Sequence, residues 1–166
     1  MTDSFLLGLS KWLSATSLSR EIQSAGWIIP TLQTVHILGV AVLFSSVILV
    51  DLRVLRVLLR DVPLADVAQR FLPVIWPVLL VLLVSGSVLI IGEPRRALLN
   101  TTFYLKMALL LVAIVLTAGL QSSFASTFWE KGQRQRVAGR LAAALSILVW
   151  CGILIAGRWI AYTEVG

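Results

Sequence analysis

The chain carries four long apolar runs separated by short polar connections, over residues 27–50, 71–92, 103–124 and 141–162. Each run has about 20 residues or more, which makes roughly 30 Å of α-helix and matches the hydrocarbon thickness of a bilayer. Polar and apolar residues do not alternate with a period of two, which excludes barrel strands. The pattern therefore predicts an all-α protein, an integral membrane four-helix bundle made by a single domain over residues 1–166.

The segment at residues 4–22 has a narrower apolar stripe than the four runs. Phe5, Leu9 and Trp12 recur at helical spacing, while Lys11 falls on the opposite face. We predict an N-terminal amphipathic helix that lies in the membrane interface. Packing of this helix against the bundle is the alternative.

The connection after the first run carries Arg53, Arg56 and Arg60 at positions i, i+3 and i+7. This spacing predicts that the first helix continues beyond the bilayer and then follows the lipid headgroups. Lys and Arg are more numerous in the two connections on this side than on the side that holds both termini. The positive-inside rule therefore places both termini outside, in the periplasm of a bacterial cell.

The composition agrees with a membrane protein, with 58% hydrophobic residues, 13% charged residues and a mean hydropathy of +0.95. A soluble domain of this size would need more polar surface. The net charge of +6 comes from residues in the short connections, so no basic patch on a polar domain remains to bind nucleic acid. The expected partner is the lipid bilayer. The chain could also bind a second copy of itself or a partner membrane subunit.

Polar residues inside the apolar runs concentrate at one end of the predicted bundle. In an up-and-down bundle, the first and third helices begin where the second and fourth end. The residues with polar or ligand-forming side chains at this end are therefore Gln33, His36, Glu93, Tyr104, Lys106, Met107, Arg158 and Tyr162. His36 is the only histidine and lies about 13 Å along its helix, counted from Trp27 at about 1.5 Å per residue.

An ionisable residue inside the membrane is costly to bury and therefore suggests a functional site. The imidazole of His36 could ligate a metal or haem iron, or relay a proton. Gln33 lies one turn earlier on the same face, and Gly39 one turn later leaves space for a bulky partner. The alternative is a structural histidine that is hydrogen-bonded across helices to a serine or a carbonyl group.

Four further residues at this end are candidate ligand contacts. Arg158 could hold a haem propionate, a quinone oxygen or a lipid phosphate, and Tyr162 shares a face with it. Lys106 needs a compensating partner, either Glu93 or an anionic ligand. Met107 could be a second haem ligand opposite His36. The alternatives are snorkelling to the headgroups for the two cations and simple packing for the methionine.

Two residues suggest other kinds of site. Cys151 reaches a depth similar to that of His36, and the two together would suit Cu(I), although a buried apolar cysteine is the alternative. Asp51 lies at the opposite end of the first helix, where an acid opposes the helix dipole. We expect a structural ion pair between Asp51 and an arginine that precedes the fourth run, Arg140 or Arg136.

Three short motifs carry a resemblance to a known family: "W..P..Q..HILG" at 27–39, "DLRVL" at 51–55 and "GR.IAY" at 157–162. The chain resembles an uncharacterised family of small bacterial inner-membrane proteins that is known by a domain-of-unknown-function label. This resemblance implies a multi-pass four-helix protein of the bacterial inner membrane without an established activity. More remotely, the chain is similar to copper-resistance-D-type and haem-binding four-helix membrane proteins.

Three functional hypotheses follow. The first is a haem b or quinone-binding electron-transfer module centred on His36. The second is a protein that handles copper or another small solute, with His36 and Cys151 as metal ligands. The third is a non-catalytic structural or assembly subunit. The sequence holds no HExxH, GxSxG, P-loop or CxxC motif, which excludes the hydrolase and nucleotide chemistry that these motifs carry.

Overall fold

The structure is a computed structural model that describes residues 2–125 and 133–160. These residues form helices and no strands: α1 (Thr2–Ser14), α2 (Ser17–Ser24), α3 (Ile28–Val54), α4 (Leu64–Gly92), α5 (Pro94–Leu98), α6 (Thr101–Ala125) and α7 (Gln133–Trp159). Of these, α3, α4, α6 and α7 are long and apolar enough to cross a membrane. The prediction of an all-helical chain with four long apolar helices is confirmed.

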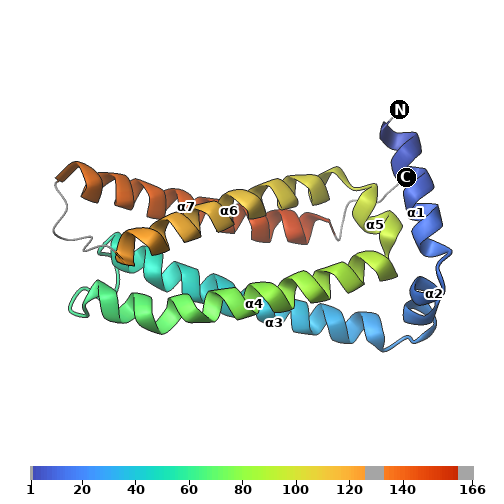
Figure 1. Ribbon diagram of the computed structural model, residues 1–166, viewed down its shortest axis with the longest axis horizontal. Helices are drawn as coiled ribbons and strands as arrows, with labels where there is room; N and C mark the ends of the chain where they lie inside the picture. The colour runs from blue at the N-terminus through green and yellow to red at the C-terminus, as the bar shows by residue number, and fades with distance from the viewer. Residues whose placement is uncertain (1, 126–132, 161–166) are drawn as a thin grey trace.

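The four long helices form two antiparallel pairs, α3 with α4 and α6 with α7, and α7 packs on α3 (Figure 1). The start of α3, the end of α4, the start of α6 and the end of α7 lie at one end of the bundle, as the sequence predicted. The short helix α5 and the N-terminal helices α1 and α2 lie at this same end, where α1 runs across the bundle axis (Figure 1).

The core of the bundle is an apolar cluster drawn from all four long helices. Its buried members are Leu43, Val47, Val50, Val67, Ala68, Leu72, Ile75, Ala113, Val149, Trp150 and Ile153. The outer faces are apolar as well, since Leu83, Val115 and Leu148 are 68%, 70% and 69% exposed. Large exposed apolar surfaces of this kind are typical of helices that contact lipid or another protein.

The N-terminal segment forms two helices, because Thr16 begins a new one. The Thr16 hydroxyl accepts a hydrogen bond from the backbone N–H of Ser19, at 3.3 Å, and so caps α2. Ser19 Oγ donates to the carbonyl of Ile91 at 2.7 Å, and Gln23 Nε2 donates to that of Gly92 at 2.9 Å. The last carbonyls of a helix lack partners within it, so α2 satisfies the end of α4 and packs against the bundle.

The first helix continues beyond its apolar run as predicted, but only to Val54, and it does not extend through Arg56 and Arg60. Arg56 has a φ of 59°, its N–H bonds the carbonyl of Arg53 at 3.1 Å, and Val57 N–H bonds that of Leu52 at 2.9 Å. This pattern is a Schellman motif, which ends α3. Leu59 also has a positive φ, 54°, so the chain turns into a loop instead.

The helix α4 begins before the apolar run that predicted it. It starts at Leu64 rather than at residue 71, since residues 64–70 form polar turns ahead of the run. Pro73 and Pro77 therefore both lie inside the helix.

Candidate functional site

The His36 imidazole, on α3, contacts α4 through a serine. His36 Nδ1 lies 2.8 Å from Ser85 Oγ, and Ser85 is 3% exposed. The same Oγ donates to the carbonyl of Val81 at 2.8 Å. Because a hydroxyl has one hydrogen, Ser85 then accepts its second bond from the His36 Nδ1–H. In this arrangement His36 Nε2 carries the lone pair and is the atom that remains for a ligand.

Two glycines let α3 and α4 approach closely near His36. A Cβ on Gly86 of α4 would lie 3.4 Å from His36 Cε1, so the ring packs against the bare backbone of α4. A Cβ on Gly39 would lie 2.9 Å from Leu82 Cδ2. The space that Gly39 leaves on α3 is therefore occupied by Leu82 of α4.

Lys106 joins this site from α6. Its side chain is half-buried and lies across Gly157 of α7, where a Cβ would be 3.6 Å from the Lys106 Nζ. Its ammonium group interacts electrostatically with the His36 imidazole. Among the described residues, no carboxylate forms an ion pair with Lys106. We call His36, Ser85 and Lys106 the His36–Lys106 site. Gly86 lies against the His36 ring and Gly157 lies against the Lys106 side chain, where a larger residue would crowd them.

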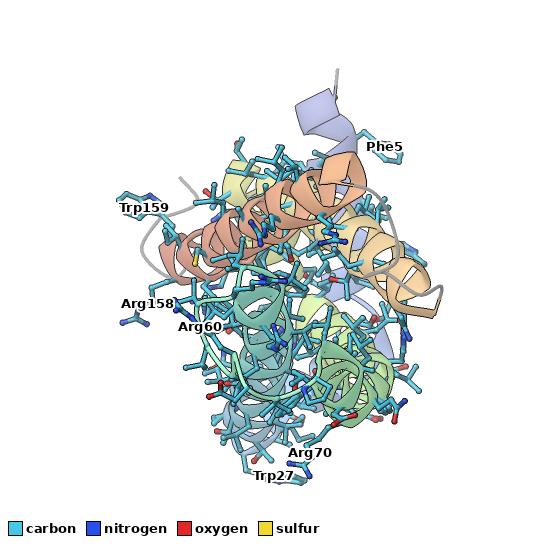
Figure 2. All side chains as sticks on the ribbon, turned by 90° about the vertical axis from the view of Figure 1, so that its left-hand side faces the viewer. Phe5, Trp27, Arg60, Arg70, Arg158 and Trp159 are labelled. Carbon is cyan, nitrogen blue, oxygen red and sulfur yellow. The ribbon has the colours of Figure 1, made fainter. Side chains whose placement is uncertain are left out.

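The other residues that the sequence predicted as ligand contacts at this end are not all directed into the bundle. Gln33 and Met107 are half-buried on α3 and α6. Arg158 is exposed and lies at the periphery of the bundle beside Trp159 (Figure 2). Tyr162 lies outside the described residues. The structure therefore brings Lys106 to His36 and directs Arg158 away from the bundle.

Cys151 is half-buried on α7. In the part of the chain that the structure describes, no group of three or more His, Cys, Asp and Glu residues is arranged to hold a metal ion. His36 and Cys151 are thus not part of such a cluster.

Asp51 does not form the predicted ion pair with Arg140. Asp51 is 1% exposed and its Oδ2 has no hydrogen-bond partner, while Arg140 is exposed, and no ion pair joins them in the described part of the chain. Thr117 Oγ1 and Trp150 Nε1 are also buried without a partner. The Ser146 hydroxyl lies beside the Asp51 carboxyl. Asp51 therefore belongs to a polar group inside the bundle core.

This core group borders a small cavity of about 10 Å³, which Asp51 and Thr117 help to line. A volume of this size is at the lower limit for one water molecule.

No curated protein and no solved structure is significantly similar to the chain. Residues 10–163 match one protein family, described as "Family of unknown function (DUF6644)". The match supports the resemblance to an uncharacterised family and does not extend to the copper-resistance or haem-binding proteins. Because it covers nearly the whole chain, the protein belongs to the DUF6644 family.

Proposed function

We propose that the protein is a multi-pass membrane protein that binds a quinone at the His36–Lys106 site. The membrane placement is supported by four helices of sufficient length and by their apolar outer faces. We assign it to the bacterial inner membrane, with both termini in the periplasm, because the basic connections at the α3–α4 end favour the cytoplasm. The His36–Lys106 site then lies in the periplasmic half of the bilayer.

One observation carries the quinone assignment: the half-buried His36 and Lys106 lie within electrostatic range of each other, and no described carboxylate forms an ion pair with the ammonium group. A polar pair inside a membrane needs a hydrogen-bonding partner. Quinones dissolve in the bilayer, are flat and apolar, and carry two oxygens. The Lys106 ammonium would donate to a quinone carbonyl, and His36 Nε2 would accept from a quinol hydroxyl.

A haem b at this site is the other version of the same proposal. The bond from His36 Nδ1 to Ser85 would orient the ring, as a hydrogen bond on the other ring nitrogen does for metal-bound histidines. Leu82, however, occupies the space next to Gly39, so that space is not open to a macrocycle. The geometry therefore favours the smaller quinone headgroup. Electron transfer would require a partner membrane subunit that holds the second redox centre.

The test is the content of bound quinone in protein purified in a mild detergent. Solvent extraction and mass spectrometry should find about one quinone per chain in the wild type, and several-fold less in Lys106→Met and His36→Leu. Lys11→Met removes an exposed cation at the same end of the bundle and serves as the control. Equal quinone content in all four proteins would refute the proposal. Optical spectra of oxidised and dithionite-reduced protein test whether the ligand is haem b instead. Bound haem b requires a Soret band of stoichiometric intensity.

A structural or assembly subunit is the second candidate function, and the His36–Ser85 contact favours it. A hydrogen bond from His36 to a serine of a neighbouring helix is what this hypothesis predicts. His36→Leu should then leave the cellular phenotype intact and lower stability by about 1 kcal/mol. The hypothesis gives no role to Lys106, so loss of phenotype in Lys106→Met with unchanged stability would count against it.

A further inference from the structure

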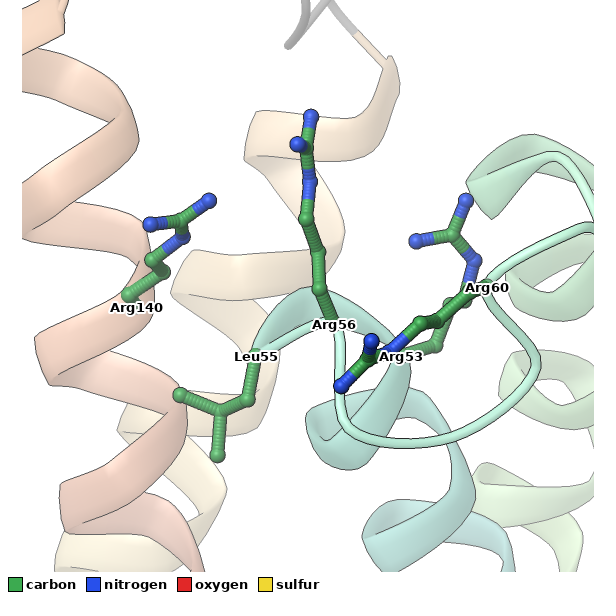
Figure 3. Close-up of a pocket in the computed structure, with 5 residues that line it drawn as sticks. All are labelled: Arg53, Leu55, Arg56, Arg60 and Arg140. Atoms are coloured by element: carbon green, nitrogen blue, oxygen red, sulfur yellow. The ribbon is translucent and has the colours of Figure 1, made fainter.

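An open pocket lies at the end of the bundle opposite the His36–Lys106 site. It has a volume of about 660 Å³ and lies between α7 and the loop that follows α3 (Figure 3). Four arginines and one leucine line it: Arg53, Leu55, Arg56, Arg60 and Arg140. We call this the arginine pocket. Its volume is within the range of small-molecule sites.

The arginine pocket concentrates positive charge from two parts of the fold. Arg140 extends from α7 towards the loop that carries Arg56 and Arg60 (Figure 3). Like charges around one space repel each other. In the part of the chain that the structure describes, no carboxylate forms an ion pair with Arg53, Arg60 or Arg140. A bound anion would relieve the repulsion.

Arg53 shows how the pocket is held in place. This residue is 8% exposed, and its Nε donates to the carbonyl of Val62 at 2.7 Å. This bond ties the loop back to the last turn of α3. The two terminal nitrogens of the guanidinium group remain for a ligand.

Arg56 occupies a position where glycine is usual. It is the residue after the C-cap in the Schellman motif, with a φ of 59°. An L-residue with a side chain is strained in this conformation, and glycine is not. Strained residues persist at functional sites more often than elsewhere. Arg56 lines the arginine pocket in spite of this cost.

We propose that the arginine pocket binds the phosphate groups of an anionic phospholipid headgroup. The inference rests on the membrane placement proposed above, which puts the end of α3 at headgroup depth. Guanidinium groups match phosphate oxygens in a bidentate geometry, and basic pockets between membrane helices are typical lipid headgroup sites. Leu55 supplies an apolar wall. A cluster of guanidinium groups suits a headgroup with two phosphates, as in diphosphatidylglycerol.

The test is lipid retention by the detergent-purified protein, measured by native mass spectrometry with added diphosphatidylglycerol or phosphatidylcholine. We expect the wild type to retain one diphosphatidylglycerol and no phosphatidylcholine. The double variant Arg60→Gln with Arg140→Gln should retain at least about tenfold less, since each lost guanidinium removes charge-assisted bonds. Arg70→Gln removes a cation at the same end, outside the pocket, and should behave as wild type (Figure 2).

Arg56→Gly is the most specific variant, because it removes a guanidinium and relieves the strain at once. It should lower lipid retention while thermal stability stays equal or rises. This variant also keeps the test decisive if the double variant does not fold.

Three outcomes would overturn the proposal. These are equal loss of lipid in Arg70→Gln, equal retention of phosphatidylcholine, and displacement of the lipid by millimolar inorganic phosphate, which would make free phosphate the ligand. Membranes washed with alkaline carbonate test the placement separately. A chain released by the wash refutes the membrane placement, whereas a chain that stays but retains no lipid refutes the arginine pocket alone.

Discussion

The hydrogen bond between His36 and Ser85 joins α3 to α4 at the candidate site, and its strength can be predicted. We consider His36→Leu, Ser85→Ala and the double variant. Hydrogen bonds between membrane helices average about 0.6 kcal/mol and reach about 1.7 kcal/mol. The bond here is 2.8 Å long, and Ser85 is 3% exposed, so water does not compete for it. We therefore expect a coupling energy of about 1 kcal/mol, towards the upper half of that range.

The assay is unfolding of purified protein in mixed micelles titrated with sodium dodecyl sulfate, followed by tryptophan fluorescence. Ser85→Ala also removes the bond to Val81, but this loss cancels in a double-mutant cycle because it does not involve His36. Ser87→Ala is the matched control, since Ser87 makes the same bond to the carbonyl of Leu83, at 2.7 Å, but is exposed. Its coupling with His36→Leu should be near zero. A coupling at Ser85 no larger than that at Ser87 would refute the reasoning.

Two further changes test the packing of the bundle in the same titration. Gly39→Ala should lower stability by about 1–3 kcal/mol, because its Cβ would lie 2.9 Å from Leu82 Cδ2, whereas Gly119→Ala should be tolerated, since a Cβ there meets nothing within 4 Å. Equal effects of the two changes would contradict the close approach of α3 and α4. Asp51→Asn should change stability by less than about 2 kcal/mol, because no ion pair is lost. A loss of about 3–5 kcal/mol, together with a similar loss in Arg140→Gln, would instead show a buried ion pair between them.

The four long helices and their common end were predictable because both follow from simple constraints. A bilayer fixes the length of an apolar helix, and short connections force neighbouring helices to run antiparallel. These constraints place His36 and Lys106 at one end whichever way the chain is inserted. Hydropathy marks only the apolar part of a helix, however, so the polar turns of α4 before residue 71 were not predicted.

Side-chain partners were not predictable in the same way, because they depend on how each helix is rotated. Ser85 was the available signal for the partner of His36, as a serine in an apolar run, but nothing in the sequence shows that it faces α3. The rotation of α4 also places Leu82 in the space next to Gly39. The end of α3 was missed for a local reason, since Arg56 takes a conformation that the sequence would signal with glycine.

Crosslinking with a photoreactive quinone can show whether a quinone binds between His36 and Lys106. We expect the label on the turns of α3 and α6 that carry these two residues, and we expect Lys106→Met to abolish it while Lys11→Met does not. Label spread evenly over the outer faces of the four long helices, or unchanged in Lys106→Met, would rule out a quinone at this site.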